Sequence, residues 1–183
     1  MSNLQIRRAI PDESAVLTAL AHAAKRHWNY PEEWITHWKD DLTITSDFIA
    51  RNEVFVATIE GEIVGCCALV LIESLAELEH MWIDPRQMGK GIGRALFAQV
   101  QARARELTAS RLELSADPHA EKFYERMGAV RIGLVPADVS GHARVLPRMR
   151  VELGVRSSAR QFGVLPSGGD PSKIPPKSGA PKH

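Results

Sequence analysis

Cysteine is scarce in this sequence of 183 residues, which has two, Cys66 and Cys67. They are adjacent within an apolar run, and neighbouring residues of a β-strand point to opposite faces of the sheet. Two such thiols do not meet in a disulfide, and adjacent cysteines match none of the spacings that bind zinc. We therefore expect two small buried side chains, with neither a disulfide nor a metal site.

Long apolar runs and an excess of one charge are also missing. No window holds roughly eighteen consecutive apolar residues, and the N-terminal stretch MSNLQIRRAI has no apolar core of the signal-peptide type. The formal net charge is +1, so nothing global indicates a nucleic-acid partner. We expect a cytoplasmic protein without a membrane segment and without a nucleic-acid partner.

The composition changes over the last part of the chain. Residues 155–183 carry five prolines, four glycines, five serines and a charge of +4, which leaves residues 1–154 at −3. Such a segment buries too little apolar surface to offset the entropy of ordering it. We expect one folded domain over residues 1–154 and a disordered basic tail over residues 155–183. The alternative for the tail is an arm that grips an anionic partner.

Residues 1–154 combine helical and strand patterns. Helices are expected over residues 13–27, from Pro31 through Trp38, from the glycine-rich stretch to Leu107, and over residues 118–127. Strands are expected near residues 4–9, 75–83, 111–116, 130–135 and 146–153, and residues 53–74 predict a hairpin that turns at Gly61. Consecutive strands favour hairpins over a doubly wound parallel sheet. The expected fold is a single-domain α/β fold with a mixed, largely antiparallel sheet flanked by helices, in the order β-α-α-β-β-β-α-β-α-β-β.

The stretch DPRQMGKGIGRALF, residues 84–97, places Gly89, Gly91 and Gly93 directly before a helical pattern. Glycines let main-chain N–H groups approach a ligand closely, and a helix N-terminus presents unpaired donors that favour an anion. A dinucleotide-binding loop would need its third glycine one residue later, and a nucleotide triphosphatase loop would need a hydroxyl residue directly after the Gly-Lys pair. Both are excluded by spacing, so we expect a phosphate site of another type.

MGKGIGRALF, preceded by LEHMWIDP, resembles the acyl-CoA pyrophosphate loop of the GNAT superfamily of N-acyltransferases. Met88 stands where that loop has an arginine or glutamine. Downstream, DPHAEKFYERMGA resembles the family's second motif, with Asp117 at a position that is usually asparagine. The resemblance covers roughly residues 4–153 as architecture and residues 75–129 as motifs.

The resemblance implies a role for each matching residue. Main-chain groups of Met81, Trp82 and Ile83 would pair with the pantetheine arm of acetyl-CoA, which would act as the acyl donor. Asp117 would line the channel, and Tyr124 would lie near the sulfur as the general acid. The N–H groups that would hold the pyrophosphate belong to Gly89, Lys90, Gly91, Ile92, Gly93 and Arg94, with added charge from Lys90 and Arg94.

The general base and the acceptor pocket are less determined. Glu77 and Glu79 are two residues apart in a predicted strand, so we expect both on one face, and either one could be the base. On the same alternation, His80 would point to the other face. Trp28, Tyr30 and Trp34 cluster around the junction of the first two helices. They would line the acceptor pocket or, alternatively, pack in the core.

Together these features predict an N-acetyltransferase that moves the acetyl group of acetyl-CoA to a primary amine of a small molecule, an amino-acid derivative or a peptide. One alternative is a non-catalytic acyl-CoA-binding module. Another is an acetyltransferase that acts on tRNA-linked or ribosomal-protein amines. Because members of the family often pair, a homodimer is possible.

Overall fold

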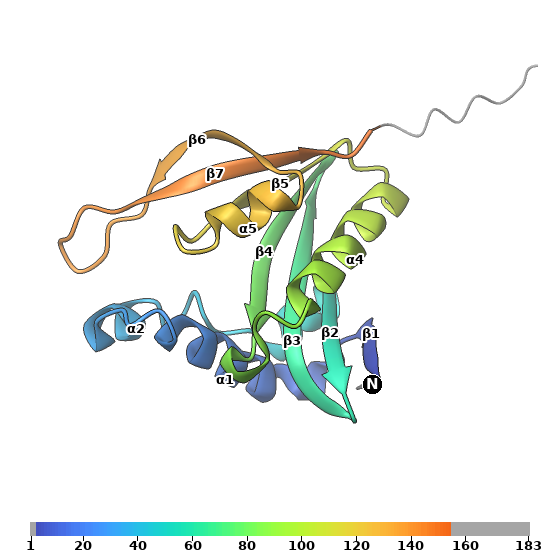
Figure 1. The fold of residues 1–183 in the computed structure, drawn as a ribbon, viewed down its shortest axis with the longest axis horizontal. Coiled ribbons are helices and arrows are strands. Elements are labelled where there is room, and N and C mark those ends of the chain that lie inside the picture. Colours follow the sequence, from blue (N-terminus) through green and yellow to red (C-terminus); the bar gives the residue numbers. More distant parts are fainter. Residues whose placement is uncertain (1–2, 155–183) are drawn as a thin grey trace, which may run out of the picture.

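A computed structural model describes residues 3–154, and they form one sheet with helices on both faces (Figure 1). The expected tail over residues 155–183 lies outside the described residues. The elements are β1 (Leu4–Arg8), η1 (Pro11–Glu13), α1 (Ser14–Arg26), α2 (Glu32–His37), α3 (Ser46–Arg51), β2 (Glu53–Ile59), β3 (Glu62–Ile72), β4 (Leu75–Ile83), η2 (Pro85–Gln87), α4 (Ile92–Glu106), β5 (Arg111–Ser115), α5 (Glu121–Arg126), β6 (Val130–Pro136) and β7 (Val145–Glu152).

The seven strands lie in the order β1-β2-β3-β4-β5-β7-β6. Every neighbouring pair is antiparallel except β4 and β5, which are parallel. The expected hairpin is β2–β3, and its turn places Glu60 at φ 52° and Gly61 at φ 88°. The predicted mixed, largely antiparallel sheet is confirmed. One α-helix is new: α3, whose N-cap Thr45 accepts a hydrogen bond from the Phe48 N–H at 3.0 Å, was not among the predicted helices.

Two apolar cores lie on opposite faces of the sheet. On one face, α4 packs Leu96, Phe97 and Val100 against residues of β2 to β5 and β7. On the other, α1 and α3 pack against β2 and β3. Cys67 belongs to the first core and Cys66 to the second, and both are free and fully buried, as the alternation of strand side chains predicts.

A β-bulge interrupts β4. Ala68 of β3 pairs with His80 and Leu69 pairs with Leu78, so Glu79 has no partner on β3. A bulge shifts the alternation of side chains by one position. Leu78 therefore lies on the α4 face, whereas His80 lies on the α1 face, where its ring contacts Phe48 of α3. The prediction that His80 points away from the face of Glu77 was wrong, because simple alternation does not continue through a bulge.

The parallel pair of β4 and β5 is short. Only three rungs connect them, from Leu75 opposite Arg111 to Glu77 opposite Glu113. Beyond that point β4 continues beside β3 to Ile83, while β5 stays paired with β7 as far as Ser115. In Figure 1, β4 runs down beside β3 and β5 lies with β7. The sheet is thus opened between two of its central strands.

Gly65 lets α4 and the end of β4 pack tightly against β3. A Cβ atom there would lie 3.0 Å from the Cδ1 atoms of Ile83 and Leu96. We expect Gly65→Ala to lower the free energy of unfolding by about 1–3 kcal/mol, because several packed side chains must move. Urea denaturation of both proteins measures the difference. The matched control is Gly133→Ala, since a Cβ at that strand position meets no atom within 4 Å. Equal midpoints for the two variants would contradict this account of the packing.

Candidate functional site

A cavity of about 500 Å³ lies where β4 and β5 separate. Its walls come from β4 beyond the last rung, the end of β5, the glycine-rich loop, the first turn of α4 and α5, with α1 at one end. The predicted residues that line it are Trp28, Glu79, Met81, Trp82, Ile83, Gly89, Gly91, Ile92, Gly93, Arg94, Asp117 and Tyr124. The structure thus brings most of the predicted site residues to one cavity, and their roles there stay predictions.

Unpaired main-chain donors surround the start of α4. Gly89 has φ 79° and Gly91, the N-cap residue, has φ 85°, a region that other residues rarely adopt. Among the hydrogen bonds of residues 3–154, the first N–H of α4 with an acceptor is that of Ala95, 3.1 Å from the Gly91 carbonyl oxygen. The N–H groups of residues 89–94 therefore remain available. A Cβ on Gly89 or Gly91 would meet no atom within 4 Å, so the space beside them is open. This arrangement suits an anion such as a phosphate.

The cationic side chains near this loop differ in whether they line the cavity. The Lys90 ammonium donates to Oε1 of Gln87 at 2.8 Å, and Lys90 is not part of the cavity lining. Arg94 and Arg126 both line the cavity, and neither is in an ion pair within the described part of the chain. Arg126 was missed by the sequence prediction. It follows Tyr124 by two residues in α5, and its proximity to the loop depends on how α5 docks.

Tyr124 is buried and lines the cavity. Its ring packs edge-on against the rings of Phe97 and Phe123, with centroids 5.5 and 5.1 Å away. Burial raises the pKa of the Tyr124 phenol, and the nearby Cys67 and Asp117 raise it further. The hydroxyl therefore stays protonated at neutral pH and can act as a proton donor.

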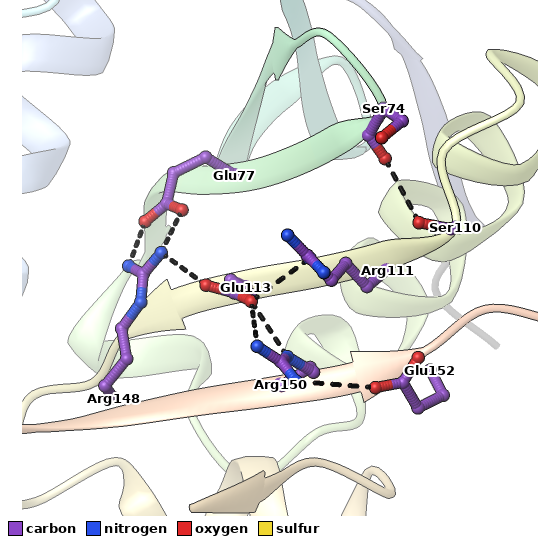
Figure 2. Close-up of polar contacts among 8 residues, drawn as sticks. All are labelled: Ser74, Glu77, Ser110, Arg111, Glu113, Arg148, Arg150 and Glu152. Carbon is purple, nitrogen blue, oxygen red and sulfur yellow. Dashed lines mark hydrogen bonds and ion pairs between the residues drawn. The ribbon is translucent and has the colours of Figure 1, made fainter. Parts of the chain in front are cut away.

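The two candidate glutamates have different surroundings. Arg148 binds both carboxylate oxygens of Glu77, with its Nη1 at 2.5 Å from Oε1 and its Nη2 at 2.6 Å from Oε2, and Glu77 does not line the cavity (Figure 2). Glu79 occupies the bulge and lines the cavity. Partial burial raises the pKa of Glu79, the negative charges of Glu77 and Asp41 raise it further, and Arg148 lowers it. Of the two, Glu79 is the better placed to accept a proton.

Asp117 is the centre of a buried polar cluster. Its Oδ2 accepts from the Lys25 ammonium at 2.7 Å and from Arg144 Nη2 at 3.1 Å. Its Oδ1 accepts from the Tyr30 hydroxyl at 2.9 Å and from the His119 N–H at 3.1 Å. Burial by itself would raise the pKa of Asp117, but the Lys25 charge and the hydrogen bonds from Lys25, His119 and Tyr30 hold it below its ordinary value. Asp117 thus lines the cavity with a carboxylate that four donors already occupy.

The aromatic residues predicted for the acceptor separate into two groups. Trp28 lines the cavity and stacks on the His119 ring at 4.8 Å. Tyr30 and Trp34 do not line it, and both pack against the buried cluster that contains Trp38. Cations already cover the rings of Tyr30 and Trp38, because the Lys25 ammonium lies 4.9 and 4.3 Å from their centroids. For Tyr30 and Trp34, the structure favours the packing alternative.

Sequence reasoning missed Lys25 and Arg144. Lys25 had a signal, since it follows Leu17, Ala21 and Ala24 on the buried stripe of α1, where a lysine needs a partner. Arg144 had none, because it lies outside any periodic segment and reaches Asp117 only through the loop between β6 and β7.

Two kinds of feature are absent from the described residues. Within residues 3–154, no group of three histidine, cysteine, aspartate or glutamate side chains is placed to hold a metal ion. No helix in the same range is both long and apolar enough to span a membrane.

One family profile matches the chain, and a related sequence and several solved structures are similar to it. The profile of the Acetyltransferase (GNAT) family matches residues 17–129. The chain is 27% identical to the uncharacterized protein YdhI of Bacillus subtilis over 143 residues, which cover 76% of this chain and 84% of that protein. A GCN5-related N-acetyltransferase from Rhodopseudomonas palustris superposes with a TM-score of 0.68 at 21% identity, covering 83% of this chain and 97% of the other. YncA, a putative acetyltransferase of Salmonella typhimurium with its cofactor acetyl-CoA, superposes with a TM-score of 0.65 at 19% identity, covering 86% and 98%.

Asp117→Asn should destabilise the protein. The change leaves Lys25 and Arg144, each with a side chain about 10% exposed, without the carboxylate that they share. We expect the free energy of unfolding at pH 7 to fall by about 3 kcal/mol. Because the pKa of Asp117 is lowered on folding, its contribution is complete above about pH 4 and is lost as the pH falls through the folded value. The difference between the proteins should therefore shrink in acid.

Denaturant unfolding over a pH series measures this difference. The control is Asp47→Asn, because Asp47 pairs with Arg51 at an exposed position and should contribute no more than about 0.5 kcal/mol. A loss for Asp117→Asn as small as that of the control would show that the buried cluster adds little to stability.

Proposed function

The chain belongs to the GNAT acetyltransferase family, and we propose that it moves an acetyl group from acetyl-CoA to a primary amine of a small molecule, an amino-acid derivative or a peptide. One observation carries the proposal. The unpaired N–H groups of residues 89–94 border the same cavity that Tyr124 and Glu79 line. A cavity with a main-chain anion site and a separate acid–base pair suits a phosphorylated donor that reacts at its other end.

The donor would lie along the opening in the sheet. Its pyrophosphate would accept hydrogen bonds from the N–H groups of residues 89–94, with Arg94 and Arg126 beside it. Its pantetheine arm would follow β4 at Met81, Trp82 and Ile83, where the strand has lost β5 as a neighbour. An extended ligand that pairs with an open strand edge gains main-chain hydrogen bonds, as an added strand does. Met88 does not weaken this cradle, because the cradle is made of backbone donors.

The reaction needs a neutral amine. A lysine-type amine with pKa about 10.4 is neutral in roughly one molecule in 2,500 at pH 7, a handicap of about 4.6 kcal/mol. Glu79, with its raised pKa, would take the proton directly or through a water molecule. A Glu79→Gln variant with wild-type turnover would remove Glu79 from this role.

The amine nitrogen would then attack the thioester carbonyl carbon. The new N–C bond forms, the C–S bond breaks, and the Tyr124 hydroxyl donates a proton to the departing thiolate. The proton that the acylated nitrogen loses then restores the Tyr124 hydroxyl. No covalent intermediate on the protein is needed. Cys66 and Cys67 are poor nucleophiles, because burial raises the pKa of the Cys66 thiol to about 12 and that of Cys67 well above its ordinary value.

The proposal is tested by binding and turnover measured on the same protein. Isothermal titration should show binding of coenzyme A, and thiol release from acetyl-CoA should be stimulated by members of a panel of amines, amino acids, polyamines, aminoglycosides and peptides. The panel also includes aminoacyl-tRNA and ribosomal proteins. The control is Gly91→Val, which should abolish coenzyme A binding because valine at φ 85° is strained and its side chain fills the open space.

Each outcome of that experiment has a distinct meaning. Binding without turnover on any amine would favour a non-catalytic acyl-CoA-binding module. Turnover restricted to tRNA-linked or ribosomal-protein amines would favour the other alternative. Wild-type protein that does not bind coenzyme A would overturn the proposal. The cytoplasmic location and the homodimer stay predictions.

Tyr124→Phe should lower kcat by about a hundredfold and leave the affinity for acetyl-CoA unchanged, because the ring still packs but the proton donor is lost. Thiol-release assays give kcat, and isothermal titration gives the Kd for acetyl-CoA. Phe123→Leu is a control for disturbed packing beside Tyr124, since it retains the hydroxyl. Equal kcat values for Tyr124→Phe and the wild type would exclude Tyr124 as the acid.

A further inference from the structure

A network of ion pairs crosses three strands next to the cavity (Figure 2). Glu77 of β4 and Glu113 of β5 lie on the same face of the sheet, and Arg148 of β7 reaches both of them. Its Nη2 donates to Glu77 at 2.6 Å and to Glu113 at 2.9 Å. Arg150 donates to Glu113 at 2.8 Å, and among the described residues no hydrogen bond or ion pair joins it to Glu77. Arg148 is thus the side chain that joins β7 to β4 across β5.

The network lies at the point where the sheet opens. Glu77 and Glu113 form the last rung between β4 and β5. The residues that line the cavity begin one position later on each strand, at Leu78 and at Leu114. The Arg148 Nη1 also donates to the Ser115 hydroxyl at 3.3 Å, and Ser115 lines the cavity. One guanidinium therefore contacts both strands of the last rung and a residue of the cavity wall.

The last rung needs this cation. Like charges directly opposite one another on neighbouring strands destabilise the pairing. The side chains of Glu77 and Glu113 are only 16% and 9% exposed, so water screens their repulsion poorly. A bidentate guanidinium between two carboxylates replaces that repulsion with charge-assisted hydrogen bonds in a fixed geometry. Without Arg148, Glu77 would lose its partner and the rung would be free to separate.

We propose that Arg148 is a positioning residue for coenzyme A: by tying Glu77 to Glu113, it fixes the place where β4 leaves β5 and so the width of the cleft that receives the pantetheine arm. This inference rests on the proposed function. It gives Glu77, first considered as a possible base, a role in holding the cleft. The distance between β5 and the strand edge at Met81 to Ile83 would then be fixed before the ligand binds. If the rung were looser, the site would lose that pre-organisation.

Isothermal titration of the full chain with coenzyme A tests the proposal. We expect Arg148→Met to raise the Kd about tenfold, because two coupled contacts are lost at once. Arg148→Lys should give a smaller rise, since an ammonium group is a point charge that cannot bind both carboxylates in the same way. In turnover, the KM for acetyl-CoA should rise while kcat changes less. That split distinguishes positioning of the ligand from a general loss of folded protein.

Arg111→Met is the matched control. Arg111 is on the same face of β5 and touches Glu113 at 3.4 Å, but it does not reach β4. Its Kd should stay within about twofold of the wild type. The Kd of a Glu77→Gln, Arg148→Met double variant for coenzyme A should be no higher than that of whichever single variant binds more weakly. The reason is that the two residues act as one unit. Melting temperatures identify variants that are folded at the titration temperature, and Arg148→Lys decides the case if Arg148→Met does not fold.

The outcomes separate the two levels of inference. Wild-type protein that does not bind coenzyme A overturns the proposed function and this inference with it. Wild-type protein that binds, together with an Arg148 variant that binds equally well, overturns only the role of Arg148. An equal rise in Kd for the Arg148 and Arg111 variants also overturns it. The loss of affinity for coenzyme A would then follow from removing any arginine on this face.

Discussion

The parallel pairing of β4 and β5 ends after three rungs, and the geometry of the cavity follows from that interruption. Two strands that leave one another in the middle of a sheet expose main-chain donors and acceptors, which are costly to bury without partners. The chain holds β4 on β3 and β5 on β7, so the opening is kept without unfolding either half. The result is a cavity whose wall includes the edge of β4 beyond its last rung with β5.

The same physical feature recurs at the glycine-rich loop. There the unpaired groups are the N–H groups that precede the first regular hydrogen bond of α4. Gly89 and Gly91 hold the backbone at positive φ and leave open space beside it. The strand edge and the helix start line the same cavity. In the proposed function such a site depends little on the identity of side chains, and Met88 leaves its main-chain donors in place.

Charges surround this backbone site at two ends. Near the last rung, Arg148 balances Glu77 and Glu113. At the α1 end, Asp117 is shared by Lys25 and Arg144, whose charges also lie over aromatic rings. In both places a partly buried group of one sign bridges two of the other, which is stable only when the hydrogen-bond geometry is satisfied. The site is thus enclosed by ion pairs that join elements far apart in the chain.

The sequence by itself determined the features that depend on local chemistry. The hairpin at Gly61, the opposite faces of Cys66 and Cys67, the start of α4 and the family all follow from residue types at fixed spacing. Tertiary structure alone decided the bulge at Glu79, the partner of Glu77 and the saturation of Asp117. Lys25 and Asp117 are 92 residues apart, and Glu77 and Arg148 are 71 apart. Which cation meets which carboxylate over such separations depends on how strands and helices pack, and periodicity along the chain carries no information about it.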